Sequence, residues 1–198
     1  MNRLIAITGG IGSGKSVVSR VVEAIGYDVY DCDSRARQIM DGSDSIKKAI
    51  ADKICREAIG ADGSIDRCRL SAEVFGNDDK LCRLNSIVHA AVKEDLAKWA
   101  SERREAFVET AILYQSGLDR MVSDVWEIIA PTELRVERVI ERNGLTRDEV
   151  MKRIVAQDQY QPQAIHGRVT RIVNDGDMPL LPQIEEAIER ALSSDRFK

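Results

Sequence analysis

Eight residues near the start of the chain, Gly9–Ser16, have the types and the spacing that hold a phosphate group. They match the pattern G-x-x-x-x-G-K-[ST], in which glycines let backbone N–H groups curl around a phosphate without a steric conflict at Cβ. The ammonium group of Lys15 can reach the β- and γ-phosphates of a nucleoside triphosphate, and the Ser16 hydroxyl can hold Mg²⁺. These residues therefore predict a nucleotide-binding loop.

The segments on either side of this loop support the same prediction. Leu4–Ile7 is a short apolar run typical of a buried strand, and Val17–Ile25 has a helical pattern that Gly26 ends. A helix that begins directly after the loop adds the partial positive charge of its N-terminus at the phosphate position. The alternative, a glycine-rich turn that binds nothing, does not explain the Lys–Ser pair or the order of strand, loop and helix.

Two carboxylates, Asp31 and Asp33, stand at the end of the next expected strand, Asp28–Asp31. In open parallel sheets, ligands bind at the carboxyl ends of the strands, so these side chains are expected beside the glycine loop. Asp33 could accept a proton from an attacking hydroxyl group, and Asp31 could support a metal-bound water molecule or orient Asp33. The alternative for Asp33 is to cap the N-terminus of a helix over residues 34–40.

Three arginines, Arg135, Arg138 and Arg142, are spaced at i, i+3 and i+7, which places them on one face of a helix. Glutamates repeat beside them, so a solvated face with salt bridges is one interpretation. The other is that an arginine neutralises the charge that develops in phosphoryl transfer when a helical lid closes over the phosphates. We expect Arg142, at the helix end, to have this role, with Arg138 as the second candidate.

Short apolar segments separated by helical patterns predict an α/β fold with a five-stranded parallel sheet flanked by helices. Residues 34–105 have helical patterns, which favours a substrate-binding lobe or, alternatively, a lobe for packing alone. Residues 132–167 contain a helical hairpin that could act as a lid. The core of this single domain is then expected at about residues 1–33, 106–131 and 168–198. The expected strands are Leu4–Ile7, Asp28–Asp31, Phe107–Leu113, Val125–Ala130 and Val169–Val173.

Capping residues predict where several helices begin. Asn77 suits the N-cap of a long helix over Asp78–Arg104, and Thr146–Glu149 matches a capping box. Another helix is expected over Ser45–Ile59.

The composition limits the class of protein. The chain has 198 residues, of which 43% are hydrophobic, enough for the core of one α/β domain. Its formal net charge of −4 argues against a broad nucleic-acid or acidic-membrane surface. The first residues lack the apolar run of a signal peptide, and no segment has transmembrane length, so we expect a cytoplasmic protein. The four cysteines lack zinc-site spacing and are expected to be free thiols.

Other nucleotide-binding classes carry motifs that this chain lacks. It contains no Asn-Lys-x-Asp sequence, which would read guanine, and no D-x-x-G sequence, so it does not fit a GTPase switch protein. The expected strand Phe107–Leu113 does not finish in Asp, so the metal-binding acid of a standard ATPase is missing there. Both absences favour a kinase that acts on a small molecule.

A longer stretch around the loop carries a more specific resemblance. Ile5–Ser16 resembles the opening of the dephospho-coenzyme A kinase family, with its core Thr-Gly-Gly-Ile-Gly-Ser-Gly-Lys-Ser. Asp31–Asp33 is similar to the family's Asp-x-Asp, followed by Ala36 and Arg37 as is usual there. The resemblance covers roughly residues 4 to 176. Further matching positions, in order, are His89, Arg142, Thr146–Glu149, Gln157 and Asn174.

The resemblance implies a P-loop kinase that transfers phosphate from ATP, with Mg²⁺, to the ribose 3′-hydroxyl of dephospho-coenzyme A, the last step of coenzyme A biosynthesis. It implies a monomer or small homo-oligomer whose partner is this small molecule and neither nucleic acid nor membrane. Lys15, Asp33 and Arg142 would be the catalytic residues, and Ser16, with Asp31 through water, would hold the metal. Substrate contacts would come from Asp33, Arg37, His89 and Arg138. Nucleotide contacts would come from Gly10, Gly12, Ser13, Gly14, Lys15, Ser16, Val17 and Asn174.

Three positions depart from the family pattern. Position 90 is Ala where the family has Pro, Gln115 stands where a Glu is expected, and Val17 replaces a frequent Thr. Gln115 cannot supply the negative charge of the Glu. Two alternatives therefore stay open: a kinase for another small acceptor such as a nucleoside or nucleotide, and an ATP-binding module without catalysis.

Overall fold

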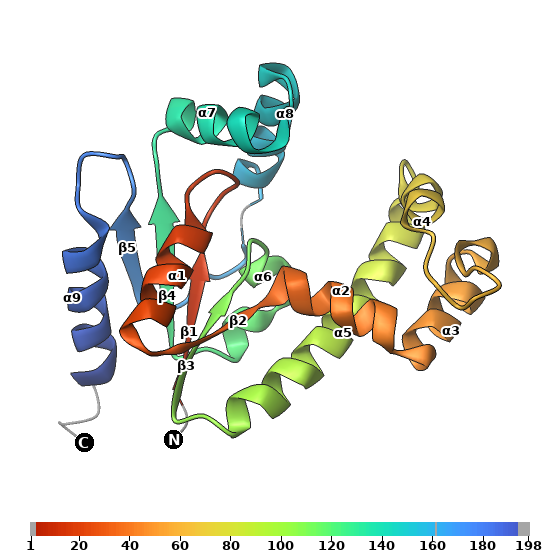
Figure 1. Ribbon diagram of the computed structural model, residues 1–198, viewed down its shortest axis with the longest axis horizontal. Helices are drawn as coiled ribbons and strands as arrows, with labels where there is room; N and C mark the ends of the chain where they lie inside the picture. The colour runs from red at the N-terminus through yellow and green to blue at the C-terminus, as the bar shows by residue number, and fades with distance from the viewer. Residues whose placement is uncertain (1–2, 161, 194–198) are drawn as a thin grey trace. The chain divides into compact units, whose positions relative to one another are not determined.

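The computed structural model describes residues 3–160 and 162–193, and its largest feature is a five-stranded sheet (Figure 1). The strand order is β2-β3-β1-β4-β5, and all strands are parallel. The predicted α/β fold with a five-stranded parallel sheet is therefore confirmed. The strands are β1 (Arg3–Thr8), β2 (Asp28–Asp31), β3 (Glu105–Glu109), β4 (Asp124–Ile129) and β5 (Val169–Val173).

The central strands are apolar because helices cover the sheet. Helices α1 (Lys15–Ile25) and α9 (Leu180–Ser193) pack on one face, where Ile5, Phe107 and Trp126 belong to a single buried cluster. The other face is partly covered by the short elements α6 (Leu113–Ser116) and η2 (Leu118–Arg120), which bury one leucine each. A parallel sheet buried in this way brings the carboxyl ends of its strands to one edge, where the loops meet.

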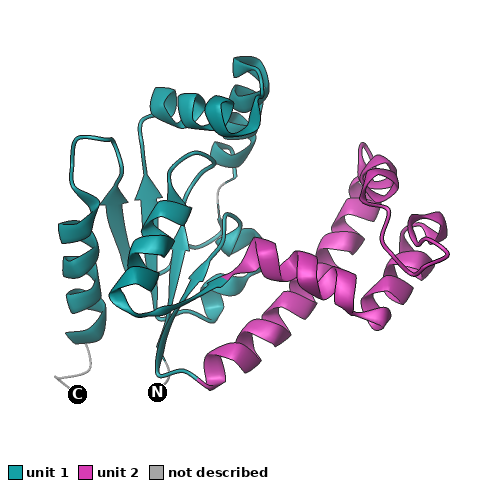
Figure 2. Cartoon of the chain, in the orientation of Figure 1, with its two compact units in different colours: residues 1–30, 103–198 teal, residues 31–102 magenta. Residues whose placement is uncertain are grey.

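The chain forms two compact units, shown in different colours in Figure 2. The first unit contains residues 1–30 and 103–198, with four strands and nearly all of β2. The second unit contains residues 31–102 and is helical, close to the lobe expected over residues 34–105. Its elements are α2 (Cys32–Gly42), α3 (Asp44–Lys53), η1 (Arg56–Ala58), α4 (Arg67–Val74) and α5 (Asp78–Ser101).

A separate apolar core holds the second unit together. Ile46 and Ile50 of α3 and Leu70 of α4 are buried in one cluster. An ion pair adds to it, because the guanidinium group of Arg35 in α2 binds both carboxylate oxygens of Asp95 in α5. The expected N-cap Asn77 is confirmed, since its side-chain oxygen accepts the Lys80 N–H at 3.0 Å.

The expected helical hairpin is present in the first unit as α7 (Thr132–Asn143) and α8 (Arg147–Asp158). Gly144 ends α7 in the left-handed conformation, and the predicted capping box of Thr146 and Glu149 begins α8. Val136 and Val139 of α7 pack against Val150 and Ile154 of α8.

Several predicted boundaries were wrong. The strand expected over Phe107–Leu113 ends at Glu109, and Leu113 instead begins α6. The helix expected over Ser45–Ile59 ends at Lys53, and the one expected over Asp78–Arg104 ends at Ser101. After β3 and α3, apolar residues continue past the element because the next segment is buried as well.

The described residues include no helix that is both long enough and apolar enough to cross a membrane. All four cysteines are free thiols.

Candidate active site

The loop Gly9–Ser16 joins β1 to α1, as its sequence predicts, and three of its glycines have positive φ angles. Gly12 has φ of 78° and Gly14 has φ of 95°, a region that residues with a Cβ rarely adopt. Space is also restricted, because a Cβ atom on Gly12 would lie 2.5 Å from the carbonyl oxygen of Arg135. These glycines are therefore required by both the curl of the loop and the close approach of α7.

The carbonyl groups of the loop are bound by side chains that surround it. The Lys15 ammonium donates to Gly9 O at 2.9 Å and to Gly10 O at 3.3 Å. The Asn174 amide donates to Ser13 O at 2.8 Å. In a trans peptide the N–H points opposite to the C=O, so the Gly14 amide faces away from Asn174. Fixing the carbonyls in this way orients loop amides for an anion.

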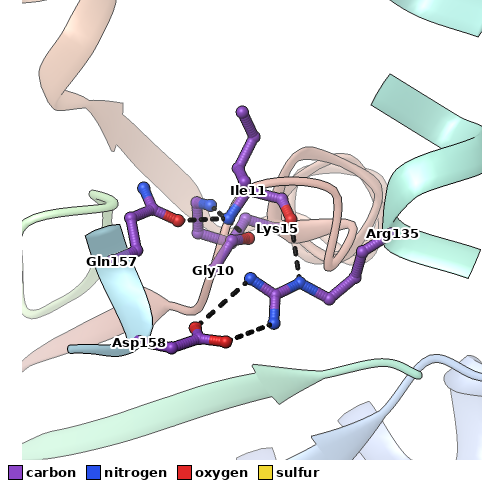
Figure 3. Close-up of polar contacts among 6 residues, drawn as sticks. All are labelled: Gly10, Ile11, Lys15, Arg135, Gln157 and Asp158. Carbon is purple, nitrogen blue, oxygen red and sulfur yellow. Dashed lines mark hydrogen bonds and ion pairs between the residues drawn. The ribbon is translucent and has the colours of Figure 1, made fainter. Parts of the chain in front are cut away.

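Both peptide groups of Ile11 are bound by the helical hairpin (Figure 3). Its N–H donates to Gln157 Oε1 at the end of α8, at 2.7 Å, and its carbonyl accepts from Arg135 Nε in α7, at 3.0 Å. The Ile11 side chain packs against the apolar contact between α7 and α8. Both helices of the hairpin thus bind the nucleotide loop at Ile11.

Arg138 and Asn174 form a second brace beside the loop. Arg138 Nη1 donates to the Asn174 carbonyl at 3.1 Å, and Nη2 donates to Asn174 Oδ1 at 3.3 Å. Asn174 follows β5 and is buried, with its Nδ2 against Gly14 and bonded to Ser13. The structure therefore brings two of the predicted site residues, one from α7 and one from the end of β5, to the loop.

Asp31 and Asp33 have different roles in the second unit. The Asp31 carboxylate caps α2, accepting the N–H groups of Asp33 at 2.9 Å and Ser34 at 3.2 Å. The capping alternative considered for Asp33 was therefore wrong, because α2 begins earlier than expected and Asp31 is its N-cap. Within the described part of the chain, the exposed Asp33 carboxylate makes no hydrogen bond.

Three other predicted residues lie apart from the loop contacts. Arg142 is exposed in the last turn of α7, where its Nε donates to Asn143 Oδ1 at 3.0 Å. Arg37 is exposed in α2, and His89 is half-buried in α5. Burial lowers the pKa of His89, and the positive charge of Lys93 lowers it further, so the imidazole is neutral at pH 7.

No role was predicted from the sequence for Glu109, the acid at the end of β3. Because β3 ends at Glu109 and pairs it with Ile7 of β1, this carboxylate lies at the carboxyl edge of the sheet, one residue from the end of β1. Glu109 is two residues after Phe107 in the strand, so both side chains point to the same face, the one covered by α1. Ser16 lies in the first turn of α1. The expectation that the strand does not finish in a metal-binding Asp was made for Leu113, whereas β3 ends four residues earlier, at Glu109.

The residues fit a magnesium ion that is held mainly by phosphates. Mg²⁺ keeps several water ligands and usually takes one or two protein oxygens, which Ser16 and Glu109 can supply. Over the ranges 3–160 and 162–193, no cluster of three His, Cys, Asp or Glu side chains forms a cage for a metal. Ser16 and Glu109 alone offer too few oxygen ligands for a metal ion that is bound by protein side chains without phosphate.

A cavity of about 790 Å³ opens beside the start of the loop, within the first unit. Its lining includes Gly9 and Gly10 of the loop, Tyr114 and Gln115 of α6, and Tyr160 after α8. Aromatic, amide and aliphatic groups share the lining, a mixture typical of small-molecule sites.

The order of the strands, the loop after β1 and the helical hairpin over it define a P-loop kinase. The chain belongs to the dephospho-CoA kinase family, whose model matches residues 3–179. A curated relative, dephospho-CoA kinase from Porphyromonas gingivalis, is 37% identical over 187 residues, which are 93% of this chain and 92% of that protein.

Solved structures agree with this fold. The crystal structure of TT1252 from Thermus thermophilus is 30% identical, with a TM-score of 0.75 and 97% of each chain covered. Dephospho-CoA kinase from Campylobacter jejuni, at 19% identity, has a TM-score of 0.64 over 98% of this chain and 99% of that one, and supports the fold alone.

Proposed function

We propose that this chain transfers the γ-phosphate of ATP to the ribose 3′-hydroxyl of dephospho-coenzyme A, producing coenzyme A and ADP in the last step of coenzyme A biosynthesis. The family match over residues 3–179 carries this proposal. The braced loop supports it, because in-line phosphoryl transfer depends on positioning and on charge stabilisation more than on covalent chemistry by the protein.

The loop and Lys15 hold the phosphates of ATP, with Gly10, Gly12, Ser13, Gly14 and Ser16 as contacts. Val17 follows in α1, and Asn174 acts on the nucleotide through its bond to Ser13. When bound, Mg²⁺ supplies charge neutralisation at the phosphates, and Ser16 and Glu109 are the residues that would hold it.

Asp33 accepts the proton of the acceptor hydroxyl as its oxygen bonds to the γ-phosphorus and the bond to the leaving ADP oxygen breaks. Of the two roles expected for Asp31, we favour orienting Asp33, since the Asp31 carboxylate accepts the Asp33 N–H. Arg142 neutralises charge on the transferring group after the hairpin moves, and Arg138 contributes from the loop side.

Arg37 and His89 are the proposed acceptor contacts from the second unit, with His89 acting as a neutral hydrogen-bonding group. The cavity beside Gly9 and Gly10 offers room for part of the acceptor next to the loop. We place the enzyme in the cytoplasm, acting on a small molecule as a monomer or small homo-oligomer.

An acceptor panel tests the substrate assignment. Purified protein with ATP and Mg²⁺ is offered dephospho-coenzyme A, adenosine and other nucleosides or nucleotides, and phosphorylated products are identified by mass spectrometry. We expect kcat/KM to be highest for dephospho-coenzyme A and activity to be lost in Lys15→Ala. A higher kcat/KM for a nucleoside would mean that the nucleoside is the acceptor. Absence of any product would favour an ATP-binding module without catalysis.

A further inference from the structure

Arg135 is the most buried charged side chain at the loop, and the phosphate chemistry described above assigns it no role. The residue is 9% exposed. Its Nε donates to the Ile11 carbonyl at 3.0 Å, and its Nη1 and Nη2 atoms each lie 3.5 Å from a different oxygen of Asp158 at the end of α8 (Figure 3). The guanidinium plane therefore joins α7, the loop and α8.

The loop has glycines at the two positions that lie against Arg135. A Cβ atom on Gly10 would overlap Arg135 Nη2, and one on Gly12 would meet the Arg135 backbone. Since Gly10 has no positive φ angle, its lack of a side chain matters here for space and not for backbone conformation. The guanidinium group thus occupies a place that a larger residue at position 10 would fill.

Gln157 binds the N–H group of Ile11, the residue whose carbonyl Arg135 binds. Its Oε1 accepts the Ile11 N–H at 2.7 Å, so this amide points toward α8 and not into the loop. Arg135 binds the Ile11 carbonyl, and the Gly12 N–H of the same trans peptide then points in the opposite direction. Together the two side chains determine which loop amide first faces the phosphates.

We propose that Arg135 and Gln157 are positioning residues that clasp Ile11, fix the Gly12 amide for phosphate binding and couple the α7–α8 hairpin to the nucleotide. Asp158 orients the Arg135 guanidinium in this clasp. A charged hydrogen bond to a carbonyl in a partly buried site is stronger than a neutral one, so its loss disorders the loop before nucleotide arrives. The inference rests only on the nucleotide-binding part of the proposed function.

Binding of ADP with Mg²⁺, measured by titration calorimetry, tests the clasp without an acceptor. Arg135→Met keeps an unbranched apolar stem and removes the guanidinium donors, and we expect the Kd for ADP to rise about tenfold or more. Arg135→Lys retains one donor group and should recover part of the affinity. In turnover assays the KM for ATP should rise in the same order, while the KM for the acceptor stays within about twofold, as expected when only nucleotide contacts are lost.

A matched control is available on the same two helices. Arg147 in α8 donates to both oxygens of Glu133 in α7 at 2.7 Å, an exposed ion pair that does not contact the loop. Arg147→Gln should leave ADP affinity unchanged, because exposed pairs contribute little. Equal weakening in Arg147→Gln and Arg135→Met would overturn the proposal, since any loosening of the hairpin would then suffice.

Wild-type ADP affinity in Arg135→Met would also overturn it. If Arg135→Met does not fold, Gln157→Met removes the partner of the Ile11 N–H from the other side and is expected to raise the Kd for ADP in the same direction. Unchanged affinity in that variant would count against the clasp. Because ADP binding needs no acceptor, these outcomes stand whether or not dephospho-coenzyme A is the substrate.

Discussion

Two carboxylates in one short segment, Asp31 and Asp33, have surroundings that assign them different tasks. Asp31 is the N-cap of α2, whereas the Asp33 carboxylate is exposed in the first turn of the same helix. An N-cap residue stabilises a helix by about 0.5–2 kcal/mol, and an exposed acid can take part in proton transfer. Asp31 therefore has the structural role, and the chemical role remains our proposal for Asp33.

Asp33→Asn should lower kcat by about 10²-fold or more, because a positioned proton acceptor typically contributes that much. The Kd for ATP should change little, since the phosphates are bound by the first unit. Asp31→Asn is the control, because an asparagine oxygen caps a helix as well as an aspartate does. Comparable turnover in Asp33→Asn and wild type would remove Asp33 from the mechanism.

Arg142 differs from Arg135 and Arg138 in lying at the exposed end of α7, away from the loop contacts. If it neutralises charge only during transfer, Arg142→Ala lowers kcat more than it weakens ATP binding. Steady-state kinetics and ATP titration measure the two effects separately. A loss confined to affinity, or no loss, would make Arg142 a solvated residue of the helix surface.

Among the secondary-structure elements, β3 places an acid, Glu109, at its carboxyl end, on the edge of the sheet where the nucleotide loop begins. Glu109 stands at the carboxyl edge of the sheet, on the face that α1 covers. Glu109→Gln keeps the size of the side chain and removes its charge, so activity should require a higher Mg²⁺ concentration while Mg²⁺-free ADP binding stays close to wild type. A Mg²⁺ dependence identical to wild type would show that Glu109 does not support the metal.

The long helix α5 carries His89, whose imidazole is harder to protonate in the folded chain than in the unfolded chain. His89 has a lowered pKa because of burial and, secondarily, the charge of Lys93. As pH falls below about 6.5, the unfolded chain binds a proton that the folded chain resists, so the free energy of unfolding decreases until the lowered pKa is passed. Urea unfolding between pH 7.5 and 5.5 should therefore show a smaller loss for His89→Gln than for wild type. Equal losses would mean that His89 does not contribute.

Local patterns predicted the loop, the caps and the helical hairpin because each is determined by neighbouring residues. The glycines and the Lys–Ser pair of the loop are contiguous, and the capping box spans Thr146–Glu149. The end of β3 was not predictable in this way. Leu113 is 1% exposed inside α6, so burial of the next element extends the apolar run beyond the strand.

Arg135 shows a second limit of sequence patterns. Its spacing with Arg138 indicates a shared helix face but does not say which face meets the loop. The decisive partners, Ile11 and Asp158, lie 124 and 23 residues away in the chain. Only the packing of α7 and α8 on the loop distinguishes this arginine from a solvated one.

For the whole molecule, the division into two units with separate apolar clusters separates nucleotide binding from the stability of the helical lobe. Ile50 is fully buried in the second unit, and Ile50→Ala should cost about 2–5 kcal/mol of local stability. ADP affinity should stay near wild type, because the loop and its braces belong to the first unit. Hydrogen exchange and calorimetry measure the two quantities, and a parallel loss of ADP affinity would contradict the separation.

If phosphate is transferred to a specific alcohol, ADP forms only when that alcohol is present, so ADP release is measured with and without dephospho-coenzyme A. We expect ADP formation that depends on the acceptor, with one ADP for each coenzyme A produced. ADP formed at the same rate without the acceptor, or no ADP in its presence, would rule out phosphate transfer to dephospho-coenzyme A.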